Sequence, residues 1–74
     1  MSNFSEQLVS LRKTRGLSQA QVAKAINAAP RAYQNYEYDE AEPRLSTLLR
    51  LADFYQVSLD ELVGREVPPP GGGA

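Results

Sequence analysis

Helix start and stop signals follow one another at short intervals along this chain, so its helices must be short. Gly16 suits a helix end, and Ser18 with Gln21 three residues later forms a capping box that starts the next helix. A second capping box, Ser58 with Glu61, stands closer to the other end of the chain. Apolar residues at helical spacing fill the intervals, and no segment shows a convincing strand alternation. The sequence therefore predicts an all-α fold class, a compact domain of five short helices.

The predicted helices cover about residues 5–15, 18–26, 30–38, 44–55 and 59–63. Pro30 suits the first turn of the third helix, because a residue there needs no N–H group. Asn27 tolerates the left-handed backbone that a sharp turn requires. The second and third helices are therefore predicted to form a helix-turn-helix. We expect residues 1–64 to be one domain and the Pro- and Gly-rich residues 65–74 to be a flexible tail.

Composition argues against several classes of site. The 74 residues include no cysteine and no histidine, so thiolate and imidazole metal ligands are absent, as is the usual acid–base group at neutral pH. No glycine-rich phosphate loop or catalytic pair of carboxylates stands out. We therefore expect no enzyme, no metal and no cofactor, and no small-molecule ligand is evident. No signal-peptide pattern and no apolar run of about 20 residues is present, so we expect a soluble, cytoplasmic protein outside the membrane.

Charge is divided unevenly between the two halves of the chain. The net charge of −1 is not the basic balance that is typical of a nucleic-acid binder. Residues 1–37, however, carry a net charge of +3, and residues 38–74 carry −4. This asymmetry is compatible with one anion-facing end, and it can equally be accidental in so short a chain.

Four blocks of sequence follow one another along about residues 4–63. They are Leu11-Arg12-Lys13-x-x-Gly16-Leu17-Ser18-Gln19-x-x-Val22-Ala23, Tyr33-Gln34-x-Tyr36-Glu37, Pro43-x-Leu45-x-Thr47-Leu48-Leu49-x-Leu51-Ala52 and Val57-Ser58-Leu59-Asp60-Glu61-Leu62. Their order and spacing resemble the Cro/C1-type (XRE) family of phage and bacterial repressors. The resemblance implies a repressor-like helix-turn-helix domain that binds double-stranded DNA in a sequence-specific way. It further implies a transcriptional repressor that binds a palindromic operator as a homodimer.

The third predicted helix, Pro30–Tyr38, is the one that the resemblance places in the major groove. The base-reading residues that it implies are Arg31, Gln34 and Asn35. The chemistry suits this role, because an arginine matches two acceptors of guanine and an amide can bond adenine through two atoms. Together with Tyr38 these residues form a polar stripe at helical spacing. The alternative is that they are solvated polar residues on an exposed helix face.

The resemblance implies contacts with the DNA backbone for a second set of residues. They are Ser18, Gln19, Pro30, Tyr38 and Arg44. Ser18 already has a structural role as an N-cap, and Arg44 could equally be a surface arginine. Gln19 has no such structural role, which makes it the better contact candidate.

An inward-facing ion pair between Arg12 and Glu37 is also implied by the resemblance. It would join the first helix to the end of the third and hold the third helix in place. The alternative is two independent surface charges. Tyr33 and Tyr36 are predicted to face the core rather than to stack on bases.

The loop Asp39-Glu40-Ala41-Glu42 departs from the family, whose members often carry glycine and basic residues there. Carboxylates repel phosphate within a screening distance of about 8 Å at physiological salt. The alternative function is therefore a protein-interaction or antitoxin-like module that uses the acidic 39–42 loop. A homodimer surface is expected around Leu59, Leu62, Val63 and Val67, although these residues could equally complete the core.

Overall fold

A computed structural model describes residues 3–64, and all regular structure in this part of the chain is helical. The helices are α1 (Asn3–Thr14), α2 (Gln19–Ala25), α3 (Pro30–Glu37), α4 (Leu45–Tyr55) and α5 (Leu59–Val63). The predicted all-α class and its five helices are confirmed. α1 begins two residues earlier than predicted, and α2 has seven residues rather than about nine. The predicted tail, residues 65–74, lies outside the described residues.

Capping side chains define where α2 and α5 begin. Ser18 Oγ accepts a hydrogen bond from the backbone N–H of Gln21 at 3.1 Å, and Gln21 Oε1 accepts one from the N–H of Ser18 at 2.8 Å. Ser58 and Glu61 form the same reciprocal pair before α5. Each such cap stabilises its helix by about 1 kcal/mol. Both predicted capping boxes are therefore present.

Left-handed residues end the helices where the sequence predicts sharp turns. Gly16, after α1, has a φ of 66°, and Asn27, after α2, has a φ of 58°. The N–H of Ala28 bonds to the carbonyl of Ala23 at 2.8 Å, which closes the end of α2. Pro30 then occupies the first turn of α3. The short link between α2 and α3 makes them the predicted helix-turn-helix.

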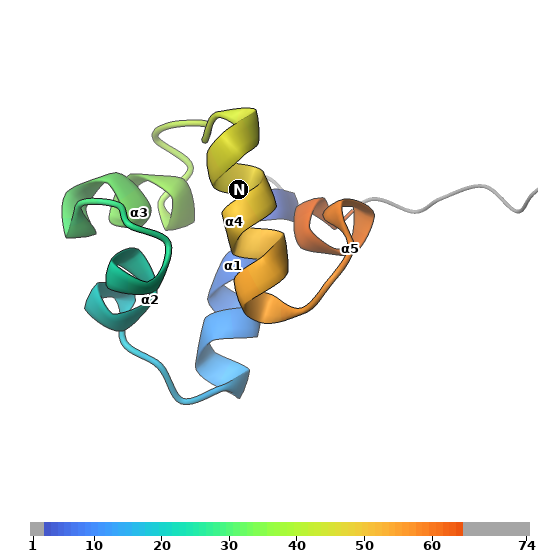
Figure 1. Ribbon diagram of the computed structural model, residues 1–74, viewed down its shortest axis with the longest axis horizontal. Helices are drawn as coiled ribbons and strands as arrows, with labels where there is room; N and C mark the ends of the chain where they lie inside the picture. The colour runs from blue at the N-terminus through green and yellow to red at the C-terminus, as the bar shows by residue number, and fades with distance from the viewer. Residues whose placement is uncertain (1–2, 65–74) are drawn as a thin grey trace, which may run out of the picture.

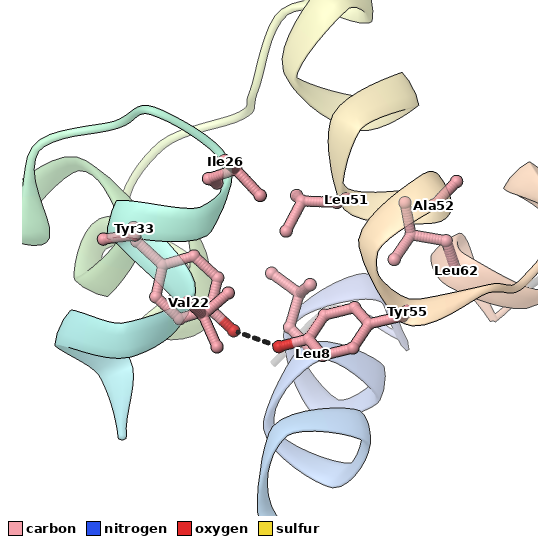
Figure 2. Packing of buried hydrophobic residues seen from close by; sticks show 9 residues of the cluster. Leu8, Val22, Ile26, Tyr33, Leu51, Ala52, Tyr55 and Leu62 are labelled. Carbon is pink, nitrogen blue, oxygen red and sulfur yellow. Dashed lines mark hydrogen bonds between the residues drawn. The ribbon is translucent and has the colours of Figure 1, made fainter. Parts of the chain in front are cut away.

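The helices enclose a single core, with α2 and α3 on one side of α4 and α5 on the other (Figure 1). α1 packs against both α3 and α5. The buried hydrophobic residues of the core are Leu8, Val22, Ala23, Ile26, Tyr33, Leu51, Ala52, Tyr55 and Leu62. Figure 2 shows these side chains converging from all five helices. Every helix therefore depends on the others for burial of its apolar face.

The inward face of α3 is anchored by aromatic residues, as predicted. Tyr33 is fully buried, and Tyr36 is half-buried and packs against the core. The hydroxyl groups of Tyr33 and Tyr55 lie 3.1 Å apart, which links α3 to α4 (Figure 2). Leu62 is also fully buried, so it belongs to the core of the single chain rather than to an exposed dimer surface. These contacts hold α3 in one position relative to the rest of the domain.

Candidate functional site

The N-terminal end of α3 is open to solvent. Pro30 and Arg31 are exposed, and the Arg31 side chain makes no hydrogen bond or ion pair with any described residue. The N-cap residue, Ala29, supplies no side-chain hydrogen bond to the first turn. At the other end of the helix, Tyr38 is 56% exposed. α3 therefore presents a free guanidinium near its start and a phenol hydroxyl just past its end.

The middle of the predicted polar stripe is less exposed than its ends. Gln34 and Asn35 are half-buried. The Oδ1 atom of Asn35 is buried, and no described residue donates a hydrogen bond to it. An unpartnered buried acceptor costs about 1–3 kcal/mol. Asn35 therefore offers an acceptor that no described residue engages.

A polar groove of about 530 Å³, here called the arginine groove, runs along one side of α3. Its lining residues are Ala32, Asn35, Tyr36, Ala41, Glu42, Arg44, Ser46, Thr47 and Arg50. Arg44 is exposed at the N-cap of α4 and makes no side-chain capping bond. Arg50 donates to the carbonyl of Ile26 at 3.5 Å, at the helix-turn-helix corner. The charged side chains in the lining are Arg44, Arg50 and Glu42, so the net charge of this groove is positive.

A second groove, here called the lysine groove, has a volume of about 690 Å³. Its lining residues are Val9, Arg12, Lys13, Ser18, Gln19, Glu37 and Tyr38, from the end of α1, the start of α2 and the end of α3. Helix α3 therefore contributes to both grooves, with different residues.

Arg12 and Glu37 form an ion pair at the base of the lysine groove. Arg12 donates from Nε to Glu37 Oε2 at 2.6 Å and from Nη2 to Oε1 at 3.0 Å. The side chains are 14% and 1% exposed, respectively. Arg12 also donates from Nη1 to the carbonyl of Leu17 at 3.0 Å. The pair joins α1 to the end of α3, as the resemblance implies.

The pKa of Glu37 reflects two opposing influences. Burial favours the neutral carboxyl, but hydrogen bonds from Arg12, Gln19 and Tyr33 outweigh it, so the pKa of Glu37 lies below its usual value. The hydrogen bond to Glu37 likewise raises the pKa of Arg12. Both side chains are therefore charged at neutral pH.

Gln19 is engaged inside the domain rather than pointing freely outward. Its Nε2 donates to Glu37 Oε1 at 3.0 Å and to the hydroxyl of Tyr38 at 3.5 Å. Ser18 is occupied as an N-cap, although a hydroxyl that accepts one hydrogen bond can still donate another. Gln19 thus links the ion pair to the exposed phenol at the end of α3.

The acidic loop is turned partly away from the exposed face of α3. Asp39 Oδ1 accepts from Ser5 Oγ, at the start of α1, at 3.2 Å. Asp39 and Glu42 also line a depression of about 240 Å³ together with Phe4, Leu48 and Val63. At least the Asp39 carboxylate is therefore held against α1, which lessens its repulsion of an anion bound along α3.

Apolar side chains remain exposed on α4 and α5. They are Leu45, Leu49, Phe54 and Leu59. Val63 is half-buried, and Val67 lies outside the described residues. Of the residues expected at a dimer surface, Leu59 is thus the exposed one in this part of the chain.

The sequence names neither Lys13 nor Arg50 as a DNA contact, although Lys13 lines the lysine groove and Arg50 lines the arginine groove. Their positions depend on how α1 and α4 pack beside α3, and no local signal reports that packing. Among residues 3–64, no group of three or more potential metal-ligating side chains is present. In the same residues, no helix has the length and apolar character needed to cross a membrane.

Comparison with known proteins relates this geometry to transcriptional regulators. The helix-turn-helix family model matches residues 8–62. The chain is 38% identical over 60 residues to the cryptic phage CTXphi transcriptional repressor RstR of Vibrio cholerae serotype O1, a match covering 81% of this chain and 54% of that protein. It is 33% identical over 64 residues to the HTH-type transcriptional regulator ImmR of Bacillus subtilis, covering 86% and 50%. The chain thus spans about half the length of the curated relatives it matches.

Solved structures give the same relationship. A transcriptional regulator from Listeria innocua superposes with a TM-score of 0.78 at 38% identity, covering 89% of this chain and 64% of the other. The SOS-response transcriptional repressor LexA from Eubacterium rectale superposes with a TM-score of 0.80 at 27% identity, covering 93% and 80%.

Proposed function

Because the chain belongs to the Cro/C1-type helix-turn-helix family of DNA-binding regulators, we propose that it is a sequence-specific transcriptional repressor that binds a palindromic operator as a homodimer. One observation carries the proposal. The exposed face of α3 lies between two grooves whose charged side chains are mainly cationic. A helix in the major groove has a sugar–phosphate strand on each side, so this arrangement fits DNA.

Base reading is assigned to Arg31, Gln34 and Asn35. Arg31 is exposed and unpaired among the described residues, so it is available to bond guanine through O6 and N7. Gln34 and Asn35 are half-buried, so an adenine contact requires their amides to rotate outward. For Asn35, this rotation gives a hydrogen-bond partner on the base to the Oδ1 atom, which has none among the described residues.

Backbone contacts are assigned to Ser18, Gln19, Pro30, Tyr38 and Arg44. Arg44, exposed on the rim of the arginine groove, supplies a charge for one strand. Tyr38 supplies a hydroxyl beside the lysine groove for the other. Gln19 acts through Tyr38, whose hydroxyl it holds. Pro30 has no N–H to donate, so its contact with DNA is by packing alone.

Homodimer formation is assigned to the exposed apolar side chains of α4 and α5, with Leu59 and Leu49 as the principal contacts. Two copies would then bind half-sites about one helical turn apart. As a regulator that acts on DNA, the protein is expected in the cytoplasm.

Selection of bound sequences from a random DNA pool tests the proposal. A palindromic motif is expected if a homodimer reads the operator, whereas a single half-site would contradict the dimer and leave DNA reading intact. Pools with no enriched motif would contradict DNA reading and favour a protein partner for the acidic loop, residues 39–42. The affinity should also fall steeply with salt, because phosphate contacts release counterions.

A further inference from the structure

The charges in the lysine groove do not cancel. Arg12 and Glu37 neutralise each other in a close ion pair. Lys13 is exposed on the groove wall, and its side chain makes no hydrogen bond or ion pair with any described residue. The groove therefore carries one uncompensated positive charge, at Lys13.

Most other donors in the groove are already used. Three of the Arg12 nitrogens donate to Glu37 or to Leu17. Both amide hydrogens of Gln19 are accounted for by Glu37 and Tyr38. Gln19 therefore has no amide hydrogen left for a ligand, and Arg12, which is 14% exposed, keeps two of its five N–H groups.

The hydroxyl groups of Tyr38 and Ser18 are different, because each accepts a hydrogen bond, Tyr38 from Gln19 and Ser18 from the backbone N–H of Gln21. A hydroxyl that accepts in this way still has its own proton to donate. Tyr38 is exposed, so that proton can be directed to a group outside the domain. The groove thus offers an ammonium from α1 and an O–H at the end of α3, and both side chains line it together with the ion pair.

We infer that Lys13 and Tyr38 form a seat for one backbone phosphate of the bound DNA, with Lys13 as the cation and the Tyr38 hydroxyl as the neutral donor. This inference rests on the proposed function and adds Lys13 to its contacts. A phosphodiester carries one negative charge, which matches the single uncompensated charge of the groove. The seat lies across α3 from the arginine groove, so the two grooves hold opposite strands of one major groove.

The test uses the salt dependence of DNA binding. Each phosphate that a protein neutralises contributes about −0.9 to the slope of log K against log salt concentration. Lys13→Gln should therefore reduce the magnitude of that slope by about 0.9 for each protomer bound. The loss of affinity should be the same on the selected duplex and on an unrelated duplex, because a phosphate contact carries no sequence information.

Lys24→Gln is the matched control. Lys24 is an exposed lysine on α2 that lines neither groove, so its loss makes the same change in net charge. It should leave the slope at the wild-type value, and Lys13→Arg should restore it. Tyr38→Phe should weaken binding to both duplexes without changing the slope, because a neutral donor releases no counterion. Melting temperatures of all four variants should match the wild type.

Equal slopes for Lys13→Gln and Lys24→Gln, in a wild type whose binding depends on salt, would overturn the seat while leaving DNA binding intact. If Tyr38→Phe binds DNA with wild-type affinity, the Tyr38 hydroxyl is not part of the seat. Absence of salt-dependent binding in the wild-type chain would instead contradict the proposed function itself.

Discussion

Arg12→Met removes the guanidinium that faces Glu37 and keeps most of its apolar stem. The Glu37 carboxylate, 1% exposed, then keeps only the hydrogen bonds from Gln19 and Tyr33 among the described residues. Breaking a buried ion pair from one side costs about 3–5 kcal/mol, because an uncompensated charge is left in the interior. We expect a loss of this size in the free energy of unfolding at pH 7.

The converse substitution should cost less. In Glu37→Met, Arg12 keeps its bond to the Leu17 carbonyl and is 14% exposed, so water can reach its freed N–H groups. The expected loss is about 1.5–3 kcal/mol, the value for hydrogen bonds to a charged group. In the double variant neither charge is left unpaired, so its loss should be clearly smaller than the sum of the two single losses.

The pH dependence should change sign between the wild type and Arg12→Met. In the wild type the pKa of Glu37 is lowered on folding, so its contribution is present above the unfolded pKa and is lost as pH falls through the folded pKa. Without Arg12, burial becomes the main influence and raises the pKa of Glu37 above its unfolded value. The variant should then regain stability as pH falls, where the wild type loses it.

Urea unfolding followed by far-UV circular dichroism measures all of these quantities, for both single variants and the double variant, at neutral and acidic pH. Additive losses, with no coupling between the two sites, would refute the reasoning. A parallel pH dependence in the wild type and Arg12→Met would show that the pair does not govern the ionisation of Glu37.

Three further substitutions test the role of Asn35 in DNA reading and the roles of the Tyr33 and Tyr55 hydroxyls in stability. Asn35→Ala should lower operator affinity in gel-shift titrations by about 1–3 kcal/mol, as for one lost base contact. The free energy of unfolding in urea should not fall, since the substitution removes an Oδ1 atom that has no hydrogen-bond partner among the described residues. A fall in both quantities together would contradict this prediction. Tyr33→Phe should destabilise the domain more than Tyr55→Phe, because it leaves the Tyr55 hydroxyl without its partner and also removes a hydrogen-bond donor from Glu37. Equal losses of unfolding free energy in urea would contradict the role of the Tyr33 hydroxyl as a link between Tyr55 and Glu37.

The helices could be predicted because their ends are specified locally. Capping boxes, Gly16, Asn27 and Pro30 act on neighbouring backbone groups, so their meaning does not depend on the rest of the fold. The length of α2 was predicted less accurately from the sequence. Its last predicted residue, Ile26, already has a φ of −95° and a ψ of 8°, because the chain leaves the helix as it approaches left-handed Asn27.

The candidate site was less accessible to sequence reasoning, because it depends on contacts between distant segments. The periodicity of α3 predicts which residues face outward, but the packing of α4 and its preceding loop determines that Asn35 is half-buried. Lys13 and Arg50 enter the grooves for the same reason. Leu62 is an apolar residue that could belong either to a dimer interface or to the core. Only its full burial in the folded chain shows that it belongs to the core.

Whether α3 reads bases is tested most directly by comparing the motif selected from a random DNA pool by the wild-type chain with the motif selected by Arg31→Ala. Arg31 is exposed and does not belong to the core cluster, so the variant should fold as the wild type does. The wild type should enrich a palindromic motif, and the variant should lose its preference for guanine at one position of each half-site while keeping the others. Recovery of an unchanged motif by Arg31→Ala would contradict the assignment of α3 as the base-reading helix.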